Sequence, residues 1–263
     1  MNRTVSLGQQ PGAPTLSGKT VLYTGAAGGL GMATSLHMLE AGARVVAIDN
    51  DPVKCEELRK AVPEAQASCL IQRSFDLSDT DTLPGKLAGL AEETGGFDIV
   101  INNAAMYPSR AFEDYSIEEY RKIQRVNVES HLMCVRAALP GMKRKGWGRI
   151  INIASITFYG GWQHLAPYVQ SKGALVGLTR AWAREFGKYG VTVNAISPGA
   201  FPTDAEKIHE DPEGYNRYVL ENQSIQRRGH AGDIAGTILF LISENAGFIT
   251  GQTINVDGGW VMQ

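Results

Sequence analysis

A tyrosine and a lysine stand four residues apart in the segment Tyr168-Val169-Gln170-Ser171-Lys172. Residues at positions i and i+4 share one face of a helix, so the lysine ammonium can approach the phenol. A free tyrosine has a pKa of about 10, which is too high for an efficient base at neutral pH. A nearby ammonium favours the phenolate and lowers this pKa. The pair therefore predicts a general acid/base that exchanges a proton with a substrate oxygen.

A glycine-rich segment could hold a phosphate. It runs from Thr24 to Gly31, directly after a short β-branched run and before a helical pattern. Glycines let the chain turn sharply and let backbone N–H groups approach a pyrophosphate, and the helix N-terminus adds partial positive charge. The position between a strand and a helix strengthens a signal that glycines alone would give weakly.

An acidic residue follows at the end of the next predicted strand. Asp49 lies roughly twenty residues beyond the glycines, where a ribose-binding carboxylate is expected. Its charge would repel the 2′-phosphate of NADP, and neither the glycine turn nor Asn50 offers an Arg or Lys to offset that repulsion. We therefore expect NAD rather than NADP as the cofactor.

Short β-branched runs alternate with longer helical patterns along the chain, which predicts βαβ units and a parallel sheet. The predicted strands are Thr20–Tyr23, Arg44–Ile48, Leu70–Phe75, Asp98–Ile101, Arg149–Ile153, Thr192–Ile196 and Thr253–Val256. The predicted helices are Leu30–Glu40, Pro52–Lys60, Leu83–Glu93, Ile117–Lys145, Tyr168–Lys188 and Asp233–Ser243. Right-handed crossovers then give an α/β fold, a Rossmann-type doubly wound sheet with helices on both faces.

We expect one domain over residues 18–263. Residues 1–17 are polar with scattered Gly and Pro and lack the apolar stretch of a secretory signal, so they read as an extension. The interval 200–228 contains no predicted strand. A long interruption of this kind in a compact domain is usually a lid or binding loop, and we expect a substrate lid there.

The composition and net charge of the chain bear on which classes of partner it could bind. Hydrophobic residues make up 43% of the chain and charged residues 20%, and the formal net charge is -2. These values favour neither nucleic acid nor a membrane surface as partner. Three scattered cysteines show no metal-ligand spacing, so we expect no metal and a reducing, cytoplasmic location.

Further motifs follow the glycine turn in order. They are Asp76-Leu77, Asn102-Asn103-Ala104-Ala105, Asn127, Ser155, the Tyr168/Lys172 pair, Pro198-Gly199 and the segment from Asn255 to Gly259. With these motifs the chain resembles the short-chain dehydrogenase/reductase family, in the branch with TGxxxGxG and YxxxK motifs. The resemblance covers nearly everything from Ser17 to Trp260.

The resemblance implies a role for each of four residues in catalysis. Tyr168 would be the acid/base, and Ser155 would hydrogen-bond the substrate oxygen. Lys172 would hold the nicotinamide ribose and lower the tyrosine pKa. Asn127 would anchor a water in a proton relay that runs through Lys172 to solvent.

It also implies a set of cofactor contacts. Asp76 and Leu77 would contact the adenine, Asn103 and Ala104 would line the ribose side, and the Phe201 backbone with Thr203 would meet the nicotinamide carboxamide. The whole expected set is Gly25, Gly28, Gly29, Leu30, Gly31, Asp49, Asp76, Leu77, Asn103, Ala104, Tyr168, Lys172, Phe201 and Thr203.

Two motifs depart from the family pattern. The segment after the fourth predicted strand reads NNAA rather than NNAG, which narrows the space beside the ribose. The usual PGxIxT pattern becomes PGAFPT from Pro198 to Thr203, in which Pro202 stiffens the hinge of the expected lid.

Aromatic and hydrogen-bonding residues occupy the loops expected to face the substrate: Met106, Tyr107, Thr157, Tyr159, Trp162, Gln163, His164, Phe201 and His209. Such walls suit a sugar, a polyol or an aryl alcohol. The predicted substrate contacts are Ser155, Thr157, Tyr159, His164 and Tyr168.

The leading hypothesis is therefore an NAD-dependent oxidoreductase that interconverts a secondary alcohol and its carbonyl. One alternative is an NADPH-dependent 3-oxoacyl thioester reductase, against which Asp49 argues. Another is a catalytically idle dinucleotide-binding sensor, which would be expected to have lost Tyr168, Lys172 or Ser155. The resembled family also leads us to expect a homotetramer, built through Ile117–Lys145, Tyr168–Lys188 and the C-terminal strand.

Overall fold

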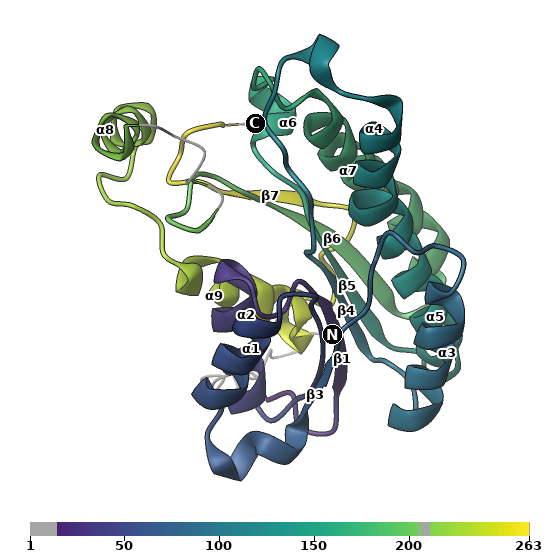
Figure 1. Ribbon diagram of the computed structural model, residues 1–263. Coiled ribbons are helices and arrows are strands. Elements are labelled where there is room, and N and C mark those ends of the chain that lie inside the picture. Colours follow the sequence, from purple (N-terminus) through teal and green to yellow (C-terminus); the bar gives the residue numbers. More distant parts are fainter. Residues whose placement is uncertain (1–14, 205, 207–210, 263) are drawn as a thin grey trace, which may run out of the picture.

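Seven runs of apolar and β-branched residues form the strands of one sheet (Figure 1). A computed structural model of the chain describes residues 15–204, 206 and 211–262. The strands are β1 (Thr20–Thr24), β2 (Arg44–Ile48), β3 (Leu70–Arg73), β4 (Ile99–Asn102), β5 (Gly148–Ile153), β6 (Val191–Pro198) and β7 (Thr253–Val256). They pair in parallel in the order β3-β2-β1-β4-β5-β6-β7. This order confirms the predicted Rossmann-type sheet.

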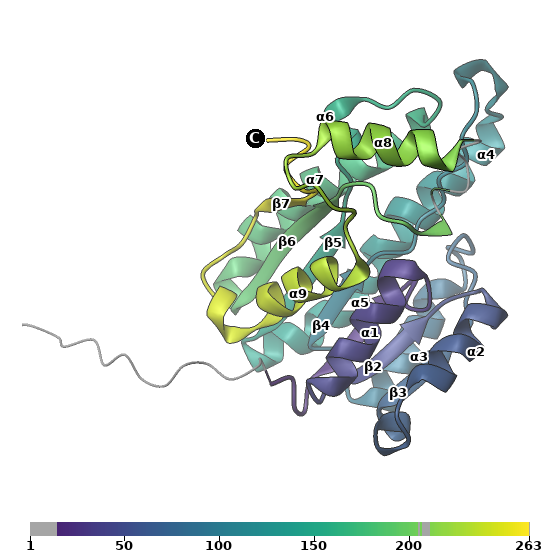
Figure 2. The same ribbon diagram turned by 90° about the vertical axis from the view of Figure 1, so that its left-hand side faces the viewer.

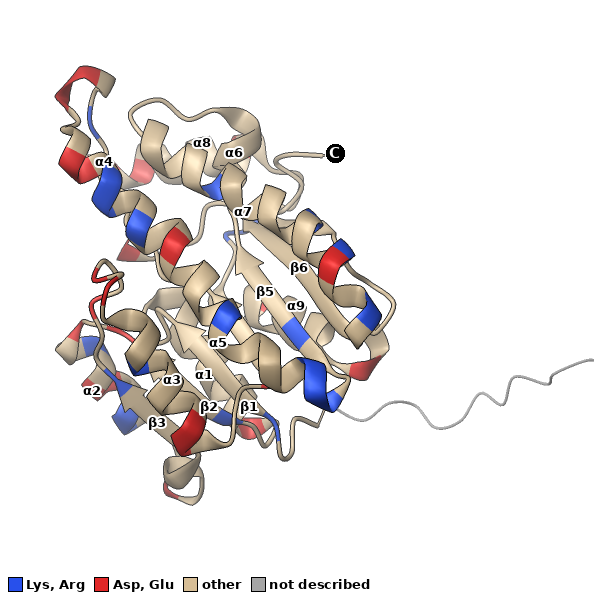
Figure 3. Ribbon diagram, turned by 90° about the vertical axis from the view of Figure 1, so that its right-hand side faces the viewer, with Lys and Arg blue, Asp and Glu red and all other residues tan. Residues whose placement is uncertain are grey.

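Helices connect successive strands and cover both faces of the sheet. They are α1 (Gly29–Glu40), α2 (Pro52–Ala61), α3 (Leu83–Thr94), α4 (Ile117–Gln124), α5 (Ser130–Lys145), α6 (Thr157–Gly160), α7 (Ala166–Phe186), α8 (Pro212–Asn222) and α9 (Ala231–Ile242). Short 3-10 helices cover Glu64–Cys69, Phe112–Asp114, Gly187–Tyr189 and Glu244–Ala246. On the face that carries α4, α5 and α7, acidic and basic residues both occur on α4 and α7, whereas the charged residues of α5 are all basic (Figure 3).

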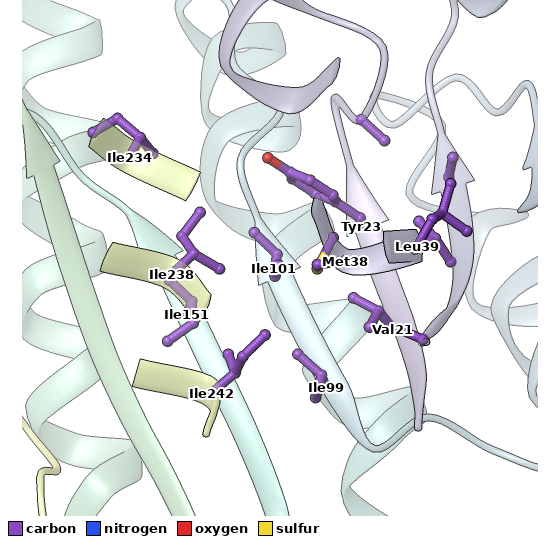
Figure 4. Close-up of a cluster of buried hydrophobic side chains, with 14 of the residues drawn as sticks. Val21, Tyr23, Met38, Leu39, Ile99, Ile101, Ile151, Ile234, Ile238 and Ile242 are labelled. Atoms are coloured by element: carbon purple, nitrogen blue, oxygen red, sulfur yellow. The ribbon is translucent and has the colours of Figure 1, made fainter. Parts of the chain in front are cut away.

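The period-2 alternation of the strands divides the core between the two faces. Val21 and Tyr23 of β1 point toward α1 and α9, whereas Leu22 points toward α3 and α5. Figure 4 shows the buried apolar cluster on the face covered by α1 and α9. In it, Ile234, Ile238 and Ile242 of α9 lie across from residues of α1 and of the central strands. Because both faces are buried, the central strands are rigid supports for the loops at their ends.

Two elements of the structure differ from the prediction in where they end or in being interrupted. Strand β3 ends at Arg73, so Phe75 belongs to the following loop, where it lines a cavity. The helix predicted over Ile117–Lys145 is interrupted by a π-helical turn at Arg125–Glu129. That turn carries Asn127, whose side chain binds a neighbouring loop, and such turns commonly mark functional sites.

Of the described residues in the lid interval, Pro212–Asn222 form helix α8, which lies at the same end of the sheet as α6 (Figure 2) but stands apart from it in Figure 1. Its Tyr218 packs on Trp260 near the C-terminal end of the chain. Residues 1–14 of the predicted extension, and residues 205 and 207–210 of the predicted lid, lie outside the described residues. Within the described part of the chain, no helix is both long and apolar enough to cross a membrane.

Candidate active site

A cavity of about 730 Å³ opens at the carboxyl ends of the strands. Strand order reverses between β1 and β4, and in open α/β sheets ligands bind at such a switch point. The cavity is lined by the glycine turn, the residues that follow β2, β3, β4 and β5, the start of α7, and the lid. The fold therefore brings the two predicted halves of the site, cofactor and catalytic, to one place.

Close backbone packing explains the glycines of the turn. Gly25 has a left-handed φ of +67°, and a Cβ at Gly31 would overlap the Gly25 carbonyl oxygen. A Cβ at Gly29 would lie 2.8 Å from the Cγ2 of Thr203, so the hinge of the lid packs directly on the turn. Gly25, Gly28, Gly29, Leu30 and Gly31 all line the cavity, as a dinucleotide site requires.

The Asp49 carboxylate is fixed by two backbone N–H groups. The N–H of Ala27 donates to Oδ2 at 3.0 Å, and that of Asp51 donates to Oδ1 at 3.2 Å. Asp49 lines the cavity next to the glycine turn, so its charge faces the space where a ribose would lie. The ammonium of Lys54 also lines this space, and it lies 2.6 Å from Asp204 and 3.8 Å from Asp51.

The other predicted cofactor contacts also line this cavity: Asp76, Leu77, Asn103, Ala104, Phe201 and Thr203. Asp76 accepts hydrogen bonds from the hydroxyl and the backbone N–H of Ser78, which lower the pKa of its carboxyl group. The Asn103 amide donates to the carbonyls of Thr24 and Gly25 at 3.2 and 2.9 Å. Asn103 thus ties the end of β4 to the glycine turn.

Tyr168, Lys172 and Ser155 converge on the other end of the cavity. Tyr168 lies in the first turn of α7, and the Lys172 ammonium is 5.4 Å from the centre of its ring. Ser155, two residues after β5, faces the Tyr168 side chain, and their interaction lowers the tyrosine pKa. Thr157 donates its hydroxyl to Ser155 at 3.0 Å, which orients the serine. This arrangement can exchange a proton with an oxygen held between the serine and the tyrosine.

Burial is the main cause of the pKa shifts of Tyr168 and Lys172. Removal from water raises the pKa of Tyr168 to about 12, against the lowering effect of the Ser155 hydrogen bond. Burial also lowers the pKa of Lys172 to about 7. In the protein alone, desolvation thus sets the direction of the Tyr168 pKa shift, and the Lys172 ammonium donates to the Ile153 carbonyl at 2.6 Å. That Lys172 lowers the phenol pKa during catalysis stays a prediction.

Asn127 is fully buried and bound on every side. Its Oδ1 accepts from the N–H of Met106 at 2.7 Å, and its Nδ2 donates to the Met106 carbonyl at 2.9 Å and to the Ser171 hydroxyl at 3.0 Å. The side chain therefore holds the loop after β4 against α7, beside Tyr168 and Lys172.

Several residues that were expected to face the substrate are not among the residues that line the cavity. Tyr159 packs on Phe158, with ring centres 5.0 Å apart, and does not line the cavity. His164 is exposed because its backbone is held in a left-handed turn, with φ of +63°, by hydrogen bonds to its carbonyl. Gln163 is also exposed, and His209 lies outside the described residues. Ser155, Thr157, Met106, Tyr107, Trp162 and Phe201 do line the cavity.

Sequence reasoning missed other lining residues: Lys54, Leu165, Asp204, Glu206 and Tyr215. The lid position of Asp204, Glu206 and Tyr215 could have suggested contact with a ligand, but no periodicity fixes which lid side chains point inward. Among the residues that are described, no group of three or more His, Cys, Asp or Glu could hold a metal ion.

Comparisons with known proteins agree with this geometry. A family model described as enoyl-(acyl carrier protein) reductase matches residues 25–261. D-beta-hydroxybutyrate dehydrogenase of Rhizobium meliloti (strain 1021) is 32% identical over 93% of this chain and 99% of its own. A chain assigned as a short-chain alcohol dehydrogenase, from Sinorhizobium meliloti 1021, superposes with a TM-score of 0.87 and is 34% identical, covering 94% of this chain and 97% of its own.

A second solved structure is the gluconate 5-dehydrogenase of Burkholderia cenocepacia J2315 in complex with NADP and tartrate. It has a TM-score of 0.85 and 26% identity, and the match covers 94% of this chain and 96% of that one. The fold thus recurs in oxidoreductases that match this chain over nearly their full length. The chain belongs to the short-chain dehydrogenase/reductase family.

Proposed function

We propose that this protein is an NAD(H)-dependent oxidoreductase that interconverts a secondary alcohol and its carbonyl, with Tyr168 as general acid/base. The observation that carries the proposal is the meeting of Tyr168, Ser155 and Lys172 in one cavity with the glycine turn and Asp49. An idle sensor would have no need of an intact acid/base group beside its dinucleotide site.

The proton chemistry follows from the burial of the pair. A bound nicotinamide would supply the hydride acceptor for the substrate's carbinol carbon and, in its oxidised form, a positive charge that favours the phenolate. In alcohol oxidation Ser155 holds the substrate hydroxyl and Tyr168 accepts its proton. The pKa of about 12 in the protein alone requires this added positive charge before the phenolate becomes accessible. Lys172, with a pKa of about 7, can pass a proton onward near neutral pH.

The preference for NAD over NADP is proposed from Asp49. Its carboxylate is held toward the glycine turn by two N–H groups, so it can accept hydrogen bonds from ribose hydroxyls and would repel a 2′-phosphate. The nearby cation Lys54 contacts Asp204 and Asp51, which offset its charge. The Burkholderia relative carries NADP, so the ratio of NAD to NADP turnover is a direct test.

For the substrate we propose a sugar, a polyol or an aryl alcohol, since aromatic rings and hydroxyl groups share the cavity wall. The test is a panel of such alcohols with NAD, followed by NADH absorbance. If no alcohol of the panel is oxidised, the proposed substrate class is wrong.

Assembly and location are also proposals. We propose a homotetramer built through α4, α5 and α7 and the β7 edge, which sedimentation would test. We further propose a cytoplasmic location, in keeping with the free thiols of Cys55, Cys69 and Cys134.

A further inference from the structure

Trp260, near the C-terminal end of the chain, contacts two walls of the cavity without lining it. The centre of its ring lies 5.7 Å from that of Trp162 and 5.6 Å from that of Tyr218 on α8. Tyr218 in turn lies 6.3 Å from Tyr215. Of these four residues, Trp162 and Tyr215 line the cavity and the other two do not. Trp260 thus lies behind one aromatic residue from the loop after α6 and another from the lid.

The turn that carries Trp260 is fixed by a buried carboxylate. Asp257 follows β7, and its two oxygens accept from the N–H of Gly259 at 2.9 Å and from the N–H of Val261 at 2.8 Å. Gly258 and Gly259 take left-handed φ values of +69° and +80°, which residues with a side chain rarely adopt. The end of the sheet therefore sets the place from which the Trp260 ring reaches its neighbours.

The same turn is joined to the lid. The backbone N–H groups of Ser224 and Ile225, which come shortly after α8, donate to the Gly258 carbonyl at 2.8 and 2.9 Å. The turn thus contacts the lid twice, once through these hydrogen bonds and once through the Trp260 ring on the helix itself. A change at Trp260 leaves the backbone hydrogen bonds in place and removes only the ring contact.

The Trp162 ring depends on contacts from outside its own loop. Gly160 ends α6 and Gly161 follows with a left-handed φ of +65°, so two residues without side chains precede the tryptophan. Glycine restricts the backbone least, and the loop alone therefore does little to fix the indole ring. On one side the ring lies against Gly160, where a Cβ would overlap it, and on another it packs on Trp260. These two contacts hold it at the cavity wall.

We infer that Trp260 is a positioning residue that sets substrate specificity, because it holds the Trp162 ring, and with it α8, where a large substrate must contact them. The inference rests on the proposed function and deepens it. If the wall were ordered for only a fraction of the time, the apparent affinity for a substrate that contacts it would fall by that fraction. A small alcohol that occupies only the space between Ser155 and Tyr168 would not be affected.

The kinetic test compares a large and a small secondary alcohol, cyclohexane-1,2-diol and propan-2-ol, with NAD. Trp260→Leu should raise KM for the cyclic diol by about fivefold, which is the size of effect that one aromatic contact supplies, and should change kcat by less than about twofold. For propan-2-ol, kcat/KM should change by less than about twofold. General damage to the active site would instead lower kcat for both alcohols.

Two matched variants separate the ring contact from other effects. Trp260→Phe keeps a ring between the two neighbours and should bring KM for the cyclic diol to within about twofold of the wild type. Trp147→Leu removes a tryptophan that packs under Lys19, outside the cavity, and should change the kinetics with neither alcohol. Because Trp260 is only half-buried, Trp260→Leu should fold like the wild type, which thermal melts check.

A double variant tests whether Trp260 acts through Trp162. Trp162→Leu removes the wall itself and should raise KM for the cyclic diol by about tenfold. If Trp260 acts by holding that ring, adding Trp260→Leu should raise KM by less than about twofold more, since the two residues share one effect. A double variant whose KM rises by the product of the two single effects would overturn the inference.

The inference and the proposed function can fail separately. Oxidation of the cyclic diol with a KM that Trp260→Leu leaves unchanged overturns the inference, while NADH production upholds the proposed function. If the wild type oxidises neither alcohol, trypsin cleavage after Arg217, an exposed residue of α8, tests the positioning role without turnover. Trp260→Leu should speed this cleavage by about fivefold and Trp147→Leu should not, because α8 opens more often once its ring contact is lost. Equal cleavage in both variants and the wild type overturns the positioning role as well.

Discussion

The ammonium of Lys172 on α7 donates a 2.6 Å hydrogen bond to the carbonyl of Ile153, the last residue of β5. Ser155 follows two residues later and faces the side chain of Tyr168. The helix that carries the tyrosine is therefore fastened to the strand end that carries the serine. Both members of the proposed oxygen-binding pair are set by the rigid sheet rather than by a free loop.

Replacing this lysine should remove both the anchor to β5 and the proton carrier. Lys172→Met fills similar volume but leaves the Ile153 carbonyl without its buried donor, and we expect kcat/KM to fall by about 100-fold or more. Lys172→Arg should not restore activity, because the larger guanidinium does not fit a fully enclosed site. The measurement is steady-state kinetics beside thermal unfolding. Full activity in either variant would contradict the assigned role.

Asp49→Ser should shift the cofactor preference. Removing the carboxylate removes both the acceptor of ribose hydroxyl bonds and the repulsion of a 2′-phosphate. We expect kcat/KM with NAD to fall and the NADP-to-NAD ratio to rise by about tenfold or more, since one charged hydrogen bond is worth roughly 1.5–3 kcal/mol. Glu56→Gln, an exposed change on α2, is the control and should leave the ratio as it is. A ratio that Asp49→Ser does not move would remove Asp49 as the selecting residue.

Two glycines of the phosphate turn should respond differently to alanine. A Cβ at Gly31 would overlap the Gly25 carbonyl oxygen, whereas at Gly28 it would make only an ordinary contact, 3.7 Å from the same oxygen. Gly31→Ala should lower the free energy of unfolding by about 1–3 kcal/mol through overpacking, and Gly28→Ala by much less. Thermal melts without cofactor provide the comparison, and equal melting temperatures would show that the turn is not packed as described.

His131 should make the fold sensitive to acid. It is fully buried on α5, and burial followed by the charge of Lys172 lowers its pKa to about 3. Because an unfolded histidine has a pKa of about 6.5, the unfolded state binds the proton first, and stability falls as pH drops from about 6.5 toward 3.

His131→Leu removes that proton uptake. We expect its free energy of unfolding to fall less steeply than that of the wild type over this pH range in urea titrations. His37→Leu replaces a histidine exposed on α1 and serves as the matched control. A parallel pH dependence in His131→Leu and wild type would contradict this account.

Spacing predicted Asp49 and the Tyr168/Lys172 pair, and the family resemblance added Ser155; most of these residues follow strands. Asp49 comes after β2, Ser155 after β5, and Tyr168 and Lys172 share one turn of α7. Parallel strands put such residues at one edge of the sheet, so local signals sufficed to bring them together.

Other features depend on contacts that local patterns do not encode. The π-helical turn at Asn127 interrupts a helix whose periodicity runs through it, and there the Asn127 side chain binds the Met106 backbone and Ser171, which lie far along the chain. The inward position of Glu206 and Tyr215 depends on how the lid packs on Arg228. His164 was predicted from loop position, but a left-handed turn directs it to solvent.

The most direct test of the proposed chemistry is Tyr168→Phe, assayed by NADH absorbance with the best alcohol of the panel. Loss of the phenolic oxygen should reduce kcat by about 10²–10⁴-fold, as expected for removal of a general acid/base. The Kd for NADH, followed by fluorescence, should change less than threefold, since the glycine turn and Asp49 remain. A Tyr168→Phe enzyme with undiminished kcat would contradict the account.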